Sequence, residues 1–306
     1  MTALALPAAA NAQQAVFPPG SGVGLVPPKG LTLSKNFSGF ESSALGASIL
    51  TVDLPLPAFT EILTGFTPEG LAASGLQASG PSVDWKIAGG DGRLIRGKQL
   101  ARGVTYRKWV VLARGRTATA MVTVQTPQTS AAELSDAAVE AALKTIALRD
   151  PPGIEEQVAG LPFRIGDRAG FRAVRALSGA GLVLTEGPQD TLRDASQPVV
   201  VVASSLGGGV VDPAGRAALA REGFVSVSGV DDLSVDNETA YDLGGAPWAR
   251  IEGRGTYRAS GEAVYVTQLV RYAPNGYIRI VAICRSLDKG RFADRFKRVA
   301  DSVAAR

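Results

Sequence analysis

The sequence contains no histidine, and it has one cysteine among its 306 residues. Histidine is the commonest general base near neutral pH and the commonest zinc ligand, so its absence excludes Ser-His-Asp and Cys-His triads. The lone Cys284 allows no intrachain disulfide and no thiolate metal cluster. Because it lies in the apolar run Ile278–Cys284, we interpret it as a buried structural thiol. We therefore expect no metal and no cofactor.

Long apolar runs are also absent. No stretch of about 18 apolar residues occurs, so the sequence predicts no membrane-spanning helix. Apolar residues make up 45% of the chain and charged residues 20%, which is typical of a globular protein. The net charge of +4 is weak evidence for a polyanionic partner.

The N-terminal residues indicate export. A short apolar run, Leu4–Ala10, leads into Ala10-Asn11-Ala12, which fits the small-x-small pattern of a signal-peptidase site. We expect a periplasmic or secreted protein that is cleaved near Ala12; a disordered alanine-rich tail is the alternative. Residues 1–12 would then be the remnant of a signal peptide, and residues 13–28, rich in proline and glycine, a linker.

Two stretches of the chain share one pattern. Val104–Pro127 and Ala263–Ser286 each indicate two β-strands joined by a tight turn, and they align without a gap, with Val111 opposite Val270. We interpret them as the end of one structural unit that is used twice.

The segments around the two hairpins support this duplication. A strand with a central glycine, Gly97 or Gly253, precedes each hairpin, and an amphipathic helix, Leu134–Leu148 or Lys289–Val303, follows it. The double proline after Asp150 cannot continue a helix and predicts a boundary. The expected domains are residues 29–149 and 161–306, joined by a linker over residues 150–160.

This pattern resembles the end of PsbP/Mog1-like domains. The residues that carry the resemblance are Gly253, Tyr265, the Pro274-Asn275-Gly276 turn, Phe292 and Phe296 in the second unit, and Gly97, Tyr106, Gly115 and Val139 in the first. The resemblance implies an α+β fold with two tandem α/β/α sandwich units, each an antiparallel sheet covered by helices. Members of the family are mostly non-enzymatic binding or assembly factors, and the resemblance supplies no catalytic residues.

The first unit contains a basic segment that no acid interrupts between Gly92 and Ala132. The candidate binding residues in it are Arg93, Arg96, Lys98, Arg107, Lys108, Trp109, Arg114 and Arg116. One sheet face that carried them would suit anionic lipid headgroups or glycans. The alternative is a solvated sheet neutralised by acids from elsewhere, such as Asp84.

An acidic segment lies in the second unit. It contains Asp231, Asp232, Asp236, Glu238 and Asp242, whose spacing does not fit a calcium-binding loop. We expect a solvent-exposed loop, and docking against the basic hairpin of the first unit is a further hypothesis.

The leading interpretation is an exported, non-catalytic binding or assembly module of the cell envelope. Its partner would be an unknown envelope protein or an anionic surface, and no nucleic acid is expected. We expect no enzyme activity. Two alternatives stay open: a histidine-independent hydrolase that uses carboxylates, and a peripheral binder of anionic lipid or glycan.

Overall fold

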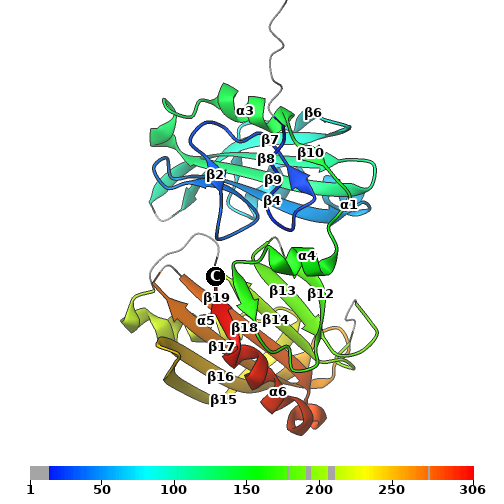
Figure 1. The fold of residues 1–306 in the computed structure, drawn as a ribbon, viewed down its shortest axis with the longest axis vertical. Helices are drawn as coiled ribbons and strands as arrows, with labels where there is room; N and C mark the ends of the chain where they lie inside the picture. The colour runs from blue at the N-terminus through cyan, green and yellow to red at the C-terminus, as the bar shows by residue number, and fades with distance from the viewer. Residues whose placement is uncertain (1–13, 102, 178, 191–193, 206–210, 275) are drawn as a thin grey trace, which may run out of the picture. The chain divides into compact units, whose positions relative to one another are not determined.

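The computed structural model describes residues 14–101, 103–177, 179–190, 194–205, 211–274 and 276–306. The chain forms two compact units, the first built mainly from Gly39–Pro151 and the second mainly from Pro152–Arg306 (Figure 1). The predicted signal-peptide remnant lies outside the described residues. Among those described, no helix combines the length and the apolar character needed to cross a membrane.

The first unit is built on an eight-stranded antiparallel sheet with the order β2-β3-β4-β9-β8-β7-β5, and β6 also pairs with β7. The strands are β2 (Thr32–Leu33), β3 (Gly39–Ser42), β4 (Ala47–Pro55), β5 (Gln77–Ala78), β6 (Val83–Ile87), β7 (Gly90–Ala101), β8 (Val104–Arg114) and β9 (Ala118–Pro127). The helices are α1 (Ala58–Leu63), α2 (Pro68–Ala72) and α3 (Asp136–Lys144), with a 3-10 turn η1 (Gln128–Ser130).

Helices cover both faces of this sheet. Helix α3 is capped by Ser135, whose hydroxyl accepts a hydrogen bond from the Ala138 amide at 3.2 Å, as an N-cap side chain does. Its residues Val139 and Leu143 are fully buried in one core with Val111 of β8. On the opposite face, Phe59 of α1 packs with Ile95 of β7 and with the alternate residues Val110 and Leu112 of β8.

The second unit has a seven-stranded antiparallel sheet with the order β12-β13-β14-β18-β17-β16-β15. Its strands are β12 (Arg172–Leu177), β13 (Gly181–Thr185), β14 (Val199–Ser204), β15 (Val230–Leu243), β16 (Ala246–Tyr257), β17 (Ala263–Ala273) and β18 (Gly276–Arg285). Its helices are α4 (Ile154–Ala159), α5 (Arg216–Val225) and α6 (Lys289–Asp301), with the 3-10 turns η2 (Pro213–Gly215) and η3 (Ser286–Asp288).

The final amphipathic helix was predicted from its apolar spacing and is confirmed as α6. Its residues Phe292, Phe296 and Val299 are buried against one face of the second sheet. The rings of Phe292 and Phe296 stack with centroids 5.9 Å apart. On the other face, Phe224 of α5 lies in a separate core.

The two sheets share one connectivity, except that β5 and β6 both pair with β7 where the second unit has the single strand β15. In each unit a strand meander leads through helices into a second meander, whose last strand returns to pair with the last strand of the first meander. Each unit also has a small two-stranded sheet that joins its start to the segment after its last helix. These pairs are β1 (Val23–Gly24) with β10 (Ala147–Leu148), and β11 (Phe163–Ile165) with β19 (Val303–Ala305). The expected α+β fold, with antiparallel sheets covered by helices, is confirmed.

Strand register corrects the sequence alignment of the two hairpins by one residue. Val111 pairs with Val122 in the α3-facing core, and the equivalent pair in the α6-facing core is Leu269 with Ile280. Val270, which the alignment matched to Val111, lies in the core on the α5 side instead. Side chains alternate along a strand, so a one-residue slip moves every residue to the opposite face.

The recurrent glycine before each hairpin has a steric cause. A Cβ on Gly97 would lie 2.4 Å from the carbonyl oxygen of Gln77 in β5. A Cβ on Gly253 would lie 1.9 Å from the carbonyl oxygen of Ser234 in β15. At both sites a neighbouring backbone comes so close that only glycine fits.

Candidate binding site

The eight predicted binding residues do not share one face of the first sheet. Arg96 lies opposite Trp109, and Lys98 opposite Arg107, on the side that faces α3. The side chains on the other face or in the β8–β9 turn are those of Arg93, Lys108, Arg114 and Arg116. Alternation along β7 and β8 therefore divides the basic residues. Their binding role stays a prediction.

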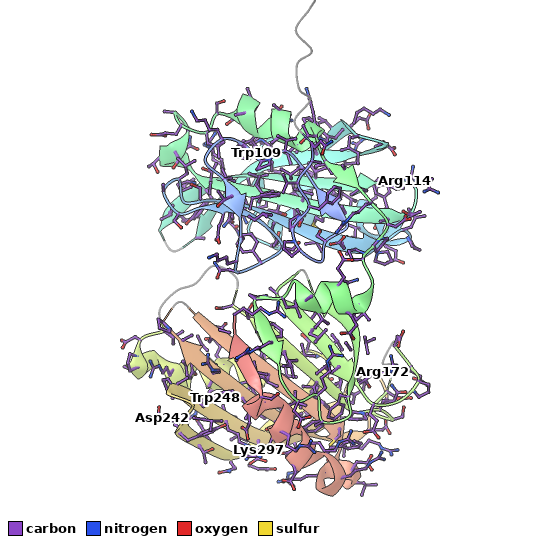
Figure 2. All side chains as sticks on the ribbon, in the orientation of Figure 1. Trp109, Arg114, Arg172, Asp242, Trp248 and Lys297 are labelled. Carbon is purple, nitrogen blue, oxygen red and sulfur yellow. The ribbon has the colours of Figure 1, made fainter. Side chains whose placement is uncertain are left out.

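Arg107 and its neighbours hold α3 against the sheet. The Arg107 side chain is 8% exposed and forms an ion pair with Asp136 at the start of α3. Its Nη2 donates to the Leu134 carbonyl at 2.7 Å, and its guanidinium lies 5.3 Å from the centre of the Trp109 ring. Figure 2 shows Trp109 inside the first unit, where it is 2% exposed. The Arg107 side chain therefore stabilises the packing of α3 on the sheet.

Arg96 makes a second contact of the same kind. Its Nε donates to Glu140 of α3 at 2.6 Å, and this bond raises the pKa of Arg96. On the other face, Arg93 pairs with Asp84 at 2.5 Å, the neutralisation by a distant acid that the sequence left open. Burial lowers the pKa of Lys108.

Only some of the predicted basic residues have exposed side chains. Arg114 lies at the rim of the first unit in Figure 2, 4.9 Å from the centre of the Phe59 ring and 3.7 Å from an Asp91 oxygen. Lys98 and Arg116 are exposed. An anionic surface would therefore meet separate charges at the two ends of β7 and β8.

In the second unit, the position that matches Arg96 is occupied by Glu252. It accepts hydrogen bonds from the Tyr265 hydroxyl, from Arg250 at 3.0 Å and from Asn237 at 3.4 Å. Burial opposes ionisation of Glu252, but these partners outweigh it and lower its pKa. Burial, together with the bond to Glu252, raises the pKa of Tyr265 to about 12.

Reactive groups with a pKa near neutrality are the usual sign of acid–base catalysis. Burial raises the pKa of Cys284 to about 12, and it raises that of Tyr272 to about 12 as well. Each carboxylate with a resolved shift has a lowered pKa: Glu155, Asp167, Asp194, Asp231, Asp236 and Glu252. Within the described ranges, no cluster of carboxylates or thiols could hold a metal ion.

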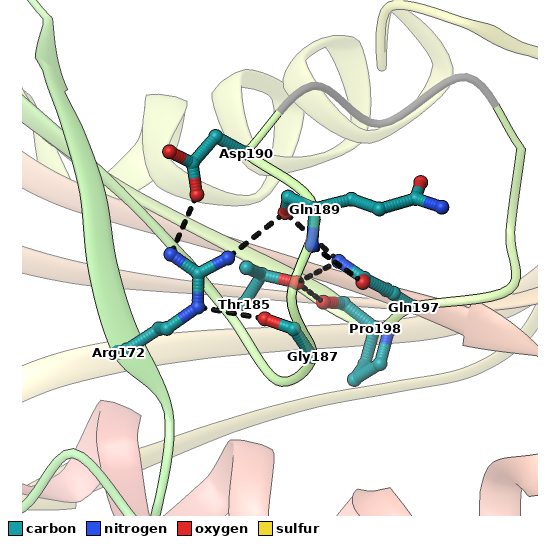
Figure 3. A network of polar contacts seen from close by, with 7 residues as sticks. All are labelled: Arg172, Thr185, Gly187, Gln189, Asp190, Gln197 and Pro198. Atoms are coloured by element: carbon teal, nitrogen blue, oxygen red, sulfur yellow. Dashed lines mark hydrogen bonds and ion pairs between the residues drawn. The ribbon is translucent and has the colours of Figure 1, made fainter.

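In the polar network around Arg172, every guanidinium nitrogen has a partner within the network (Figure 3). The guanidinium donates to the Gly187 carbonyl at 2.7 Å, the Gln189 carbonyl at 3.0 Å and Asp190 at 2.6 Å. Gln197 links the same segment to Thr185 of β13. Since each guanidinium nitrogen has a partner, we assign this network to anchoring the segment after β13.

The acidic segment is a strand, so the prediction of a loop was wrong. It forms β15, the edge strand of the second sheet. Charged side chains belong on such an edge because they discourage unwanted pairing. Its acids pair with arginines of the same unit, in the pairs Asp231–Arg258 at 2.7 Å, Asp236–Arg254 at 2.8 Å and Glu238–Arg221 at 2.6 Å.

A cleft of about 420 Å³ lies between β15 and the start of α5. Small side chains leave this space open, since Ala217, Ala240 and Ala249 are part of its lining. The other lining residues are Pro213, Arg216, Glu238, Thr239, Tyr241, Asp242, Pro247, Trp248 and Tyr272. A second hollow of about 280 Å³ adjoins it and shares Arg216, Pro247 and Tyr272.

Arg216 lines both the cleft and the adjoining hollow. Its guanidinium lies 5.3 Å from the centre of the Tyr272 ring, and its carbonyl oxygen accepts the Tyr272 hydroxyl at 2.7 Å. Its Nε is buried, and no hydrogen-bond partner is found for it in the described chain. Sequence reasoning missed this site because its walls come from α5, β15, β16 and β17, and no local motif marks it.

No protein-family model matches the chain, and no curated protein matches it significantly. Several solved structures do. Cyanobacterial PsbP from Synechocystis sp. PCC 6803 is 14% identical, covers 47% of this chain and 87% of its own, and has a TM-score of 0.36. LpqN of Mycobacterium tuberculosis, described as involved in cell envelope biogenesis, is 16% identical over 46% of this chain and 82% of its own, with a TM-score of 0.35.

A third match spans both units. The immunity protein TplEi of a type VI secretion system from Pseudomonas aeruginosa is 11% identical, covers 97% of this chain and 98% of its own, and has a TM-score of 0.33. At these identities and scores, none of the three likenesses carries an argument about function.

Proposed function

We propose that the protein is a non-catalytic binding module that recognises a partner protein through the cleft between α5 and β15. The cleft itself carries this proposal. It is open, its lining combines three alanines with aromatic side chains, and it holds a cation whose Nε lacks a partner in the described chain. A concave site with a few convergent polar groups is the usual form of a binding site.

The charges elsewhere support binding over hydrolysis. A hydrolase that relied on carboxylates would need two of them in one site, one with a raised pKa. Glu252, the most enclosed of the carboxylates described above, is surrounded by donors that keep it ionised. It is suited to holding β15, β16 and β17 together.

The proposal also covers the cellular location of the protein and the role of the first unit. We place the protein in the cell envelope, periplasmic or secreted, on the N-terminal export pattern, and we propose two tandem PsbP/Mog1-like units on their common connectivity. An anionic surface would engage the first unit through Lys98, Arg114 and Arg116, which are exposed.

The test fills the cleft and leaves the fold intact. Ala217 is exposed and lines the cleft, while Ala218 is the next residue of α5, is also exposed, and is not part of the lining. Ala217→Trp is expected to lose a partner that the unmodified protein retains from periplasmic extract, and Ala218→Trp is expected to keep it. Equal retention by both variants would contradict a role for the cleft.

A further inference from the structure

The second sheet has two edges of different character. One edge is β12, a short strand with a register shift between Ala173 and Arg175, and α4 lies against it. The other is β15, which runs the length of Val230–Leu243 and pairs only with β16 in the described chain (Figure 1). A long open edge presents unpaired amide and carbonyl groups to any extended segment that reaches it.

The two halves of β15 differ in regularity. The first half contains register shifts between Asp231 and Ser234 and between Val235 and Asn237, and Asp232 has a φ of 52°. Such bulges twist an edge away from further pairing. The second half, Asn237–Leu243, keeps unbroken register with β16 and ends at the turn before Ala246. Only this half is regular enough to accept another strand.

The regular half also carries its acidic side chains Glu238 and Asp242 on one face of the strand. Glu238, Ala240 and Asp242 alternate with the other residues of the strand and share the side that faces α5. No Lys or Arg occurs anywhere in β15, and Glu238 is paired with Arg221 of α5 at 2.6 Å. Asp242 projects outward at the edge of the second unit (Figure 2). An added strand would place its own side chains directly opposite these acids.

The cleft lies beside the same half of the strand. Residues Glu238 to Asp242 line it in succession, and Ala240 stands between the two acids. In strand addition, main-chain hydrogen bonds supply affinity, and pockets beside the edge select alternate side chains. The open edge and the cleft are separate observations, and both point to the regular half of β15 as the binding position.

We propose that Asn237–Leu243 of β15 accepts an extended, basic segment of the partner protein as an added strand. A Lys or Arg would face Asp242, the side chain two positions along would enter the cleft beside Ala240, and the residue two positions further would face the Glu238–Arg221 ion pair. This inference rests on the proposed function and specifies the chemistry of the partner.

The experiment uses the full chain and a short synthetic peptide with lysine at every fourth position and threonine elsewhere, so that a threonine meets the cleft when a lysine faces Asp242. Amide hydrogen exchange and fluorescence anisotropy are measured together. We expect saturable binding that slows exchange of the outward-facing amides within Asn237–Leu243 and leaves those of the bulged half unchanged. A peptide of the same sequence with N-methyl groups along one edge cannot pair, so we expect it not to bind.

Matched variants separate the edge from general charge. Asp242→Asn and Asp232→Asn remove the same charge from the same strand, and both residues are exposed. We expect the first to weaken peptide binding roughly two- to fivefold and the second to leave it unchanged. Equal effects, equal binding of the N-methylated peptide, or no binding would each overturn strand addition. If the Ala217→Trp variant still lost its partner in that event, the cleft proposal would stand.

Discussion

Replacing Gly253 by alanine tests why a glycine recurs before each hairpin. The new Cβ would meet the Ser234 carbonyl oxygen at 1.9 Å and the Phe224 ring at 2.8 Å. Neither neighbour can yield easily, because the first is backbone of β15 and the second is fully buried in the core against α5. Overpacking of this kind costs about 1–3 kcal/mol. For a unit of this size, that loss lowers the melting temperature by roughly 2–12 °C.

Gly290 provides the matched control for this substitution. It lies in α6, and a Cβ there would meet no atom within 4 Å. Alanine at this position should stabilise the helix by about 0.5–1 kcal/mol. Urea unfolding followed by circular dichroism compares the two variants, and hydrogen exchange in β15 localises the effect. Gly253→Ala as stable as Gly290→Ala would refute the steric explanation.

The remaining predictions concern charged residues. Arg107→Ala should lower the free energy of unfolding by about 1–3 kcal/mol, because the Leu134 carbonyl loses its donor. The control, Arg116→Ala, should change the free energy of unfolding by less than about 0.5 kcal/mol in the same urea titration. If the first unit meets an anionic surface, binding to anionic vesicles should weaken with salt and with Arg116→Ala, and salt-independent binding would count against it. The pKa of Glu252 is lowered from an ordinary 4.5, so its contribution to stability is present above that pH and lost as the pH falls through the folded value. Glu252→Gln should flatten this part of the acid-unfolding curve, and an unchanged curve would contradict the linkage.

Local patterns predicted the elements well because they depend on neighbouring residues. The spacing of Phe292, Phe296 and Val299 was enough to place α6, and the alternate apolar residues were enough to find both hairpins. The steric role of Gly253 was invisible, since it depends on the distant Ser234 carbonyl.

Register was beyond the sequence for a physical reason. Helices cover both faces of each sheet, so Leu269 and Val270 are both buried, in opposite cores. A strand that is apolar on both faces shows no alternation of apolar and polar residues. Two sequence alignments that differ by one residue therefore match the pattern equally well.

The acidic segment was misread, and the partners of the basic residues were hidden, for a related reason. The acids that neutralise Arg96 and Arg107 come from α3, and their approach depends on how that helix packs on the sheet. The density of acids in β15 suggested a loop, whereas an edge strand tolerates charge along its whole length. Contacts between residues distant in sequence decide both the ion pairs of Arg96 and Arg107 and the strand structure of the acidic segment.

The most direct test of the binding site is a photo-reactive amino acid at Ala240, which lines the cleft, compared with one at Ala218, which does not. Both residues are exposed, so both probes sample the surroundings. After illumination in periplasmic extract, we predict a discrete cross-linked partner from position 240 that is absent from position 218. The same products from both positions, or none from position 240, would contradict a binding role for this cleft.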